Sequence, residues 1–197
     1  MSPLTKQQLE QIRDERSMQI KQAALKVFAR HGFAGTKTSM IAAAAGISEG
    51  LIYRYFKSKD ILFSTIVEAL MEDAASEIND SRSMPGTPYE QIKALTLHML
   101  DDENKYAFML ILKARKMEDL PPKVTQLFEQ YSPDAIIDQL LPLFIKGQES
   151  GEFASGNPRQ LLQWYFSVIN SLILQEQGDE PYGFPDVAVL MRILTNK

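Results

Sequence analysis

Apolar residues recur at helical spacing from the start of the chain. Ile20, Ala24, Val27 and Phe28 form one stripe of a helix predicted from about Lys6 to His31. Gly32 follows directly and is typical of a helix C-terminus. A second long helix is predicted from Asp60, because its apolar residues keep helical spacing as far as Ile78. The pattern therefore predicts helical structure on both sides of residues 36–59.

The remainder of the chain continues this pattern without a strand signal or repeat. Residues 79–88, NDSRSMPGTP, are predicted to be a loop because of their Pro, Gly, Ser and Asp content. Further helices are predicted at residues 89–102, 104–119, 123–131, 134–150, 158–176 and 185–195. Asn157 and Pro158 suit the N-cap and first turn of their helix. The predicted fold class is all-α.

Residues 36–62 have the pattern of two short helices joined by a sharp turn. Gly46 lies where the chain reverses, and the small Ala42 allows the two helices to cross closely. Ser48 suits the N-cap of a second helix that ends near Tyr55 and is roughly 12 Å long. The apolar seam between the helices is expected to contain Ile41, Ala45, Ile47 and Ile52. This layout is typical of a helix-turn-helix that reads duplex DNA, although small-residue turns also occur in helical proteins without DNA.

The charge is divided unequally along the chain. The net charge is −4, but residues 1–62 contain 10 Lys and Arg against 5 Asp and Glu, which gives +5. Residues 63–197 contain 11 Lys and Arg against 20 Asp and Glu, which gives −9. Positive charge near the helix-turn-helix suits phosphate contacts, whereas chance variation in surface charge is the alternative.

The segment ALKVFARHGFAGTKTSMIAAAAGISEGLIYRYFKSKDIL, residues 24–62, closely resembles the TetR family of bacterial transcriptional regulators. The resemblance implies an N-terminal three-helix DNA-binding domain, residues 1–60, and a larger C-terminal helical domain for dimerisation and ligand binding, residues 61–197. Matched position by position, it places ten residues at DNA: Thr38, Ser39, Ser48, Glu49, Gly50, Leu51, Tyr53, Arg54, Tyr55 and Lys59.

The expected roles of these residues follow from their chemistry. Tyr53 and Tyr55 can donate to phosphate oxygens, and Arg54 suits bidentate contact with guanine or a phosphate clamp. Two positions depart from the commonest family pattern, with Glu49 in place of Lys and Leu51 in place of Thr. Glu49 can accept from cytosine or complement the helix dipole, and Leu51 can touch a thymine methyl or simply pack.

The family resemblance also implies a homodimer through the last two helices and a small-molecule effector in the C-terminal domain. The middle helices are rich in aromatic residues and Met, which suits a hydrophobic effector but is equally typical of plain core. Asn170 and His98 are candidate polar anchors. The expected ligand-binding residues are Met99, Tyr106, Phe108, Met109, Phe128, Trp164 and Asn170.

Other functional classes find little support. The chain has no Cys, only 2 His, no H-E-x-x-H motif and no phosphate-binding glycine loop, so neither catalysis nor a cofactor or metal is expected. It has no membrane-length apolar stretch and no signal-peptide core near its start, which suits a cytoplasmic protein. The leading hypothesis is a repressor that an effector releases from a palindromic operator. An activator, a regulator controlled by a protein partner and a helical scaffold that binds no DNA are the alternatives.

Overall fold

The computed structural model describes residues 5–83, 85–102, 104–131, 134–175 and 185–195. Every regular element in these ranges is helical. In chain order the elements are α1 (Lys6–Gly35), α2 (Thr38–Ala45), α3 (Glu49–Tyr55), α4 (Lys59–Ser83), α5 (Pro88–Leu100), α6 (Lys105–Ala114), α7 (Pro122–Gln130), α8 (Ala135–Glu149), α9 (Pro158–Leu174), α10 (Val187–Leu190) and the 3-10 helix η1 (Met191–Leu194). The all-α prediction is confirmed.

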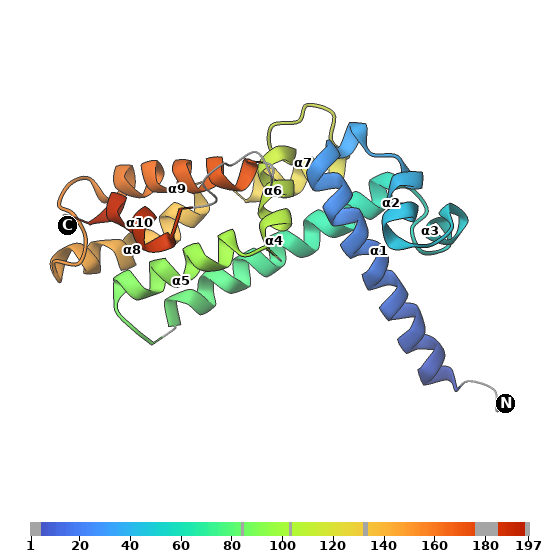
Figure 1. Cartoon of the computed structure of the whole chain (residues 1–197), viewed down its shortest axis with the longest axis horizontal. Helices are drawn as coiled ribbons and strands as arrows, with labels where there is room; N and C mark the ends of the chain where they lie inside the picture. Colours follow the sequence, from blue (N-terminus) through green and yellow to red (C-terminus); the bar gives the residue numbers. More distant parts are fainter. Residues whose placement is uncertain (1–4, 84, 103, 132–133, 176–184, 196–197) are drawn as a thin grey trace.

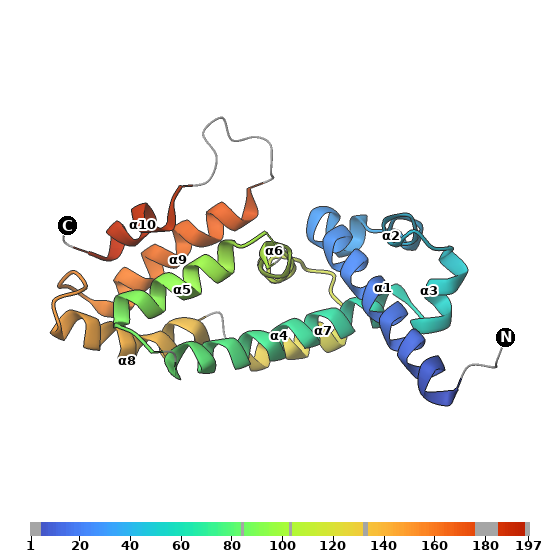
Figure 2. The ribbon, with the colours of Figure 1, turned by 60° about the horizontal axis from the view of Figure 1, so that its bottom comes forward.

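The molecule is elongated, with α1, α2 and α3 at one end (Figure 1). Helices α5, α8, α9 and α10 lie at the other end, and α4 runs between the two groups beside α6 and α7 (Figures 1 and 2). Helix α1 packs against α2, against α4 and against α6. Helices α4 and α6 therefore connect the helix-turn-helix to the rest of the chain.

The first turns of α4 belong to the core of the N-terminal group. The ring of Phe63 lies 4.9 Å from that of Phe28 and 4.8 Å from that of Phe33, measured between centroids. Leu62, Phe63 and Ile66 are buried there. Helix α4 contributes to the cores at both ends of the molecule. A tilt of α4 at one end would therefore change the packing at the other. The division at residue 60 stays a prediction.

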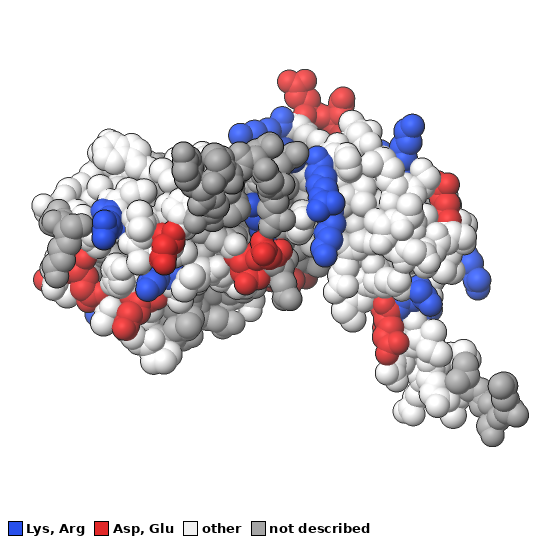
Figure 3. Space-filling view, viewed as in Figure 1, with Lys and Arg blue, Asp and Glu red and all other residues white. Residues whose placement is uncertain are grey.

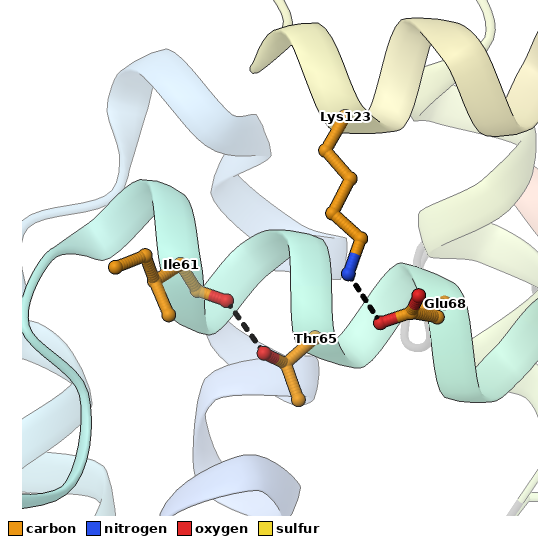
Figure 4. A network of polar contacts seen from close by, with 4 residues as sticks. All are labelled: Ile61, Thr65, Glu68 and Lys123. Carbon is orange, nitrogen blue, oxygen red and sulfur yellow. Dashed lines mark hydrogen bonds and ion pairs between the residues drawn. The ribbon is translucent and has the colours of Figure 1, made fainter.

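Helix α7 is held beside α4 by an ion pair. Lys123 Nζ donates to Glu68 Oε2 at 2.7 Å, while Thr65 on the same face of α4 donates to the carbonyl of Ile61 at 2.8 Å (Figure 4). Both charged side chains are at least one-third exposed, so we expect this pair to contribute little to stability. Val124 of α7 is fully buried, and this burial contributes more to the stability of α7 in the fold.

Four predicted boundaries need correction or refinement. Residues 79–83 are helical and extend α4, because the first helix breaker is Pro85 followed by Gly86. Helix α1 breaks at Gly32 as predicted, with φ 69°, but a further turn follows as far as Gly35. A side chain at Gly32 would collide with the methyl group of Met117.

The other two corrections concern α6 and the C-terminus. Helix α6 ends at Ala114, not at residue 119, and the chain then turns so that Met117 packs on the break in α1. The last predicted helix is a short α-helical turn followed by η1. There the carbonyl of Leu194 accepts from the backbone of Ala154 at 2.8 Å, which ties this end to the loop before α9.

Candidate DNA-binding surface

The turn between α2 and α3 has the predicted geometry. Gly46 has φ 64° and ψ 34°, the left-handed conformation that glycine adopts readily. Its neighbour Ile47 donates from its backbone to the carbonyl of Ala42 at 3.0 Å, which closes the turn. On the inner faces Ile41, Ala42, Ala45 and Ile52 are buried, and Ile47 is half-buried. The seam predicted from spacing is therefore present.

Ser48 is the N-cap of α3, as predicted from the sequence. Its φ of −78° and ψ of 149° are those of an N-cap, but its hydroxyl accepts no hydrogen bond from the helix. The capping bond that serine usually makes at this position is therefore missing, and the exposed hydroxyl is available to an external partner. The acidic Glu49 lies in the first turn, where a carboxylate complements the helix dipole.

The outer face of α3 carries most of the residues expected at DNA. Glu49, Gly50, Tyr53 and Arg54 are exposed, whereas Leu51 and Tyr55 are half-buried. A Cβ added at Gly50 would meet nothing within 4 Å, so packing inside the protein does not require glycine there. This face is therefore open to close approach from outside.

Helix α2 is joined to this face by a hydroxyl pair. Thr38 Oγ1 and the hydroxyl of Tyr53 lie 3.1 Å apart, and Ser39 beside them is exposed. The N-terminus of α2 and the middle of α3 thus present several hydroxyl groups together. Such groups bind phosphate oxygens well.

Lys59 does not simply project into solvent. Its ammonium donates to the carbonyl of Phe33 at 2.8 Å and to the carbonyl of Thr36 at 3.0 Å. It also lies 4.3 Å from the centroid of the Phe33 ring. The start of α4 is therefore tied to the corner between α1 and α2, a role that sequence spacing could not reveal. The third ammonium proton is left for a further acceptor.

The basic residues of the N-terminal group are spread over two surfaces. On the face drawn in Figure 3, basic side chains occur at the α2–α3 end and again where α1 meets α6. At that second place Arg30 donates to the hydroxyl of Tyr106 at 2.7 Å, and Lys113 donates to the carbonyl of Arg30 at 3.4 Å. Lys26 lies 5.8 Å from the centroid of the Tyr106 ring. The excess charge of residues 1–62 is thus only partly beside α3.

The residues expected around a ligand are not gathered in one place. Phe108 lines a cavity of about 60 Å³ with Leu70, Ala74, Ala107 and Ile111, and with His98, Asn104 and Asp73 as polar neighbours. Met99 and Met109 are buried in the core. Tyr106 faces α1, Phe128 lies beneath the guanidinium of Arg115, and Asn170 borders a groove between α8 and α9.

Trp164 requires a correction. It is 57% exposed on the outer face of α9 and does not line the cavity beside Phe108. Its position in a helical stripe could not distinguish an inward from an outward indole. None of the described helices is long and apolar enough to cross a membrane.

Comparisons with known proteins agree with this geometry. A family model described as bacterial regulatory proteins of the tetR family matches residues 20–66. The HTH-type transcriptional regulator AcrR of Shigella flexneri is 32% identical over 102 residues, which span 51% of this chain and 46% of that relative. The chain therefore matches less than half the length of AcrR.

Two further comparisons extend over more of the chain. The fatty acid metabolism regulator protein of Bacillus subtilis is 27% identical over 161 residues, 79% of this chain and 80% of that protein. The crystal structure of Bacillus subtilis FadR with stearoyl-CoA superposes with a TM-score of 0.58 at 22% identity, covering 89% of this chain and 94% of FadR. The latter likeness shows a shared fold. Taken with the helix-turn-helix at residues 38–55, these matches identify a DNA-binding transcriptional regulator whose residues 20–66 form a DNA-binding domain of the TetR type.

Proposed function

We propose that the protein is a repressor that binds a near-palindromic operator as a homodimer and is released by a small hydrophobic effector. The observation that carries this proposal is the outer face of α3. On the inner side of α3, Ile52 is buried in the core. On the outer side, Tyr53 and Arg54 are exposed beside the hydroxyl groups of α2. A buried inner side fixes the helix, so the exposed side can enter a major groove without rearrangement. Since its partner is chromosomal DNA, such a repressor would act in the cytoplasm.

Within this proposal the residues have different roles at DNA. Thr38, Ser39, Ser48, Tyr53 and Tyr55 position the protein on phosphates, as hydroxyl donors commonly do. Gly50 lets the backbone approach the groove, and Arg54 reads a base. Glu49 acts chiefly on the helix dipole, and Leu51 lies where it can contact a base edge. Lys59 supports this surface by holding α4 against the α1–α2 corner.

The proposed dimer surface is the outer face of α9 with α10 and η1. The α9 residues Trp164 and Val168 are exposed, as are Val189 and Ile193 of the last two elements. Helix η1 packs against α9, so the two parts form one surface. Exposed apolar residues gathered in this way are typical of an interface, and a two-fold dimer would present one α3 to each half-site.

The proposed effector site is the cavity beside Phe108, where α4, α5 and α6 meet. Its walls are mainly apolar, with His98, Asn104 and Asp73 at its polar side. At about 60 Å³ it is smaller than a typical ligand pocket, so binding requires α4 or α6 to move. Because both helices pack against α1, that movement would displace the DNA-binding end. The fatty acid regulator and the stearoyl-CoA complex make long-chain acyl compounds the first effectors to test.

The test is selection of bound duplexes from a randomised DNA pool, followed by titration at several salt concentrations. We expect a near-palindromic site, two protomers per duplex and affinity that falls steeply as salt rises. Absent or salt-insensitive binding would favour a helical scaffold instead. Long-chain fatty acids and stearoyl-CoA are then added to the complex. Release of DNA supports a repressor with an acyl effector, whereas unchanged binding with all of them removes that effector class.

A further inference from the structure

The N-terminal part of α1 projects beyond the rest of the DNA-binding group. Residues 5–15 are all exposed, and both views show this part extending past α2 and α3 (Figures 1 and 2). The segment from Lys6 to Gln19 is about 21 Å long at 1.5 Å per residue. It lies before the family match, which begins at residue 20. This projection therefore lies outside the residues that the family model matches.

The projecting helix is held in a fixed direction. Thr5 and Gln8 form a capping box, in which the Gln8 backbone donates to Thr5 Oγ1 at 3.3 Å and the Thr5 backbone donates to Gln8 Oε1 at 2.9 Å. Near its base, Gln19 Nε2 donates to the carbonyl of Ala45 at 2.8 Å. Since Ala45 ends α2, the projection is anchored directly beside the helix-turn-helix turn.

One stripe of α1 changes from apolar to basic where the helix leaves the protein core. Ile20, Ala24 and Val27 are buried against the rest of the group. At the same helical spacing the stripe continues towards the N-terminus as Arg16, Arg13, Leu9 and Lys6. Basic side chains thus lie on the side of α1 that, further along, packs on the other DNA-binding helices.

Two of these cations have no partner within the part of the chain that the structure describes. Neither Lys6 nor Arg13 makes a hydrogen bond or ion pair there. Arg16 donates to Gln19 Oε1 at 2.6 Å. Lys6 and Arg13 are therefore able to bind an external anion without first breaking an internal bond.

The stripe is continuous with the α3 surface through a groove. Arg13 and Tyr55, at the C-terminal end of α3, line a groove of about 410 Å³ with Glu10, Asp14 and Ser17. Glu10 and Asp14 lie on the neighbouring stripe of α1, so the groove itself is mixed in charge. An anion would bind along the Lys6–Arg13 edge and be repelled by these two carboxylates.

We propose that the projecting turns of α1 bind the DNA backbone next to the segment that α3 reads. Their unpartnered cations complement phosphate charge, and their surface is continuous with α3. Contacts with phosphates alone position the protein and add affinity to all sequences equally. This inference rests on the proposed binding of duplex DNA.

The test uses the full chain and a duplex that it selects from a randomised pool, with fluorescence anisotropy at several salt concentrations. For Lys6→Ala/Arg13→Ala we expect affinity at 0.1 M salt to fall roughly ten- to a hundred-fold. With two protomers on the duplex, the slope of log affinity against log salt should shrink by about 4, because each protomer loses two phosphate contacts. Glu10→Gln/Asp14→Asn should bind more tightly than the wild type. Alanine favours helix, so circular dichroism should show undiminished helicity in the first variant.

The matched control removes two exposed cations outside α1, α2 and α3, Lys116→Ala/Lys146→Ala, and should leave affinity and slope unchanged. Lys6→Arg/Arg13→Lys should retain the wild-type slope. If the wild type binds DNA but Lys6→Ala/Arg13→Ala keeps its affinity and slope, the inference is overturned while the proposed function stands. If the wild type selects no duplex, the proposed function fails and this inference fails with it.

Discussion

The ammonium of Lys59, at the first residue of α4, donates to the carbonyl oxygen of Phe33 at 2.8 Å. A second bond, 3.0 Å long, reaches the carbonyl of Thr36, so one cation satisfies two carbonyls at the corner between α1 and α2. The corner follows the break at Gly32 and precedes α2, whose N-terminus belongs to the proposed DNA surface. Lys59 therefore couples the direction of α4 to the placement of that surface.

Lys59→Ala is expected to weaken binding to all DNA sequences. It should also lower the free energy of unfolding by about 1–3 kcal/mol, because two partly buried carbonyls lose a charged donor. If Lys59 acts mainly by positioning the DNA surface and does not itself bind phosphate, the slope of log affinity against log salt should change by less than about 1. Anisotropy titrations and urea unfolding measure both effects. A slope reduced by about 2, one contact for each protomer of the dimer, with unchanged stability would show instead that Lys59 acts as a phosphate ligand.

Arg54 and Tyr53, neighbours on the exposed side of α3, should respond differently to substitution. Arg54→Ala should lose about 1–3 kcal/mol on the preferred duplex and little on a duplex with one changed base. Tyr53→Phe should weaken both duplexes alike, because it removes a phosphate donor and the contact with Thr38. Competition between the two duplexes measures the difference. An equal loss on both duplexes for Arg54→Ala would assign that side chain to a phosphate.

The sequence predicted the local features of this surface better than its long-range ones. Gly46, the N-cap position of Ser48 and the buried seam follow from spacing and backbone preference, which depend on neighbours in the chain. The partners of Lys59 are 23 and 26 residues away, so no periodicity could indicate them. The missing Ser48 capping bond depends on a rotamer that residue type alone leaves open.

The helical domain illustrates a second limit. A stripe of apolar residues predicts that a helix packs, but not which side meets the core and which meets a second protomer. On α9 the buried Leu162, Tyr165 and Ile169 and the exposed Trp164 and Val168 were therefore indistinguishable by type. For the same reason, the sequence pattern predicted Trp164 to be a ligand-binding residue, whereas it is exposed on α9.

Trp164→Glu is expected to convert the proposed dimer into monomers. A carboxylate in an apolar interface loses hydration without gaining a partner, so association should weaken by at least ten-fold. Sedimentation velocity at micromolar concentration measures the change, and binding to a two-half-site duplex should weaken in parallel. Ile145→Glu, at another exposed apolar residue on α8, is the matched control and should leave the assembly intact. Monomeric wild-type protein, or an unchanged dimer in Trp164→Glu, would remove α9 from the interface.

Tyr106→Phe should weaken the response to effector more than it weakens DNA binding. It removes the bond between Arg30 of α1 and the phenol of α6 but leaves the ring in place. Since α6 also lines the proposed effector cavity, we expect release of DNA to need two- to ten-fold more effector, about 1.4 kcal/mol of coupling at the upper limit. Tyr89→Phe on α5 is the control. Equal effector sensitivity in wild type and Tyr106→Phe would show that the α1–α6 contact carries no coupling.

Tyr165 should make the protein sensitive to alkaline pH. Its hydroxyl lies 2.7 Å from Thr96 Oγ1 in the core, and burial raises the pKa of Tyr165 to about 12. Because the folded pKa lies above that of an exposed tyrosine, near 10, this stabilising contribution is complete below pH 10 and is lost as the pH rises towards 12. The loss should approach about 1.4 kcal/mol for each pH unit in that window.

Tyr165→Phe isolates this effect. At pH 8 it should unfold about 1 kcal/mol more easily than wild type, because Thr96 loses a buried hydrogen-bond partner. Thr96 still donates to the carbonyl of Ile92, so its hydroxyl keeps one bond and the variant should fold. At pH 11 the phenol of the wild type ionises on unfolding, which favours the unfolded state, and the variant has no such group. The difference in free energy of unfolding between the two proteins should therefore shrink or reverse. Urea unfolding at the two pH values measures this, and a constant difference would mean that Tyr165 titrates alike in both states.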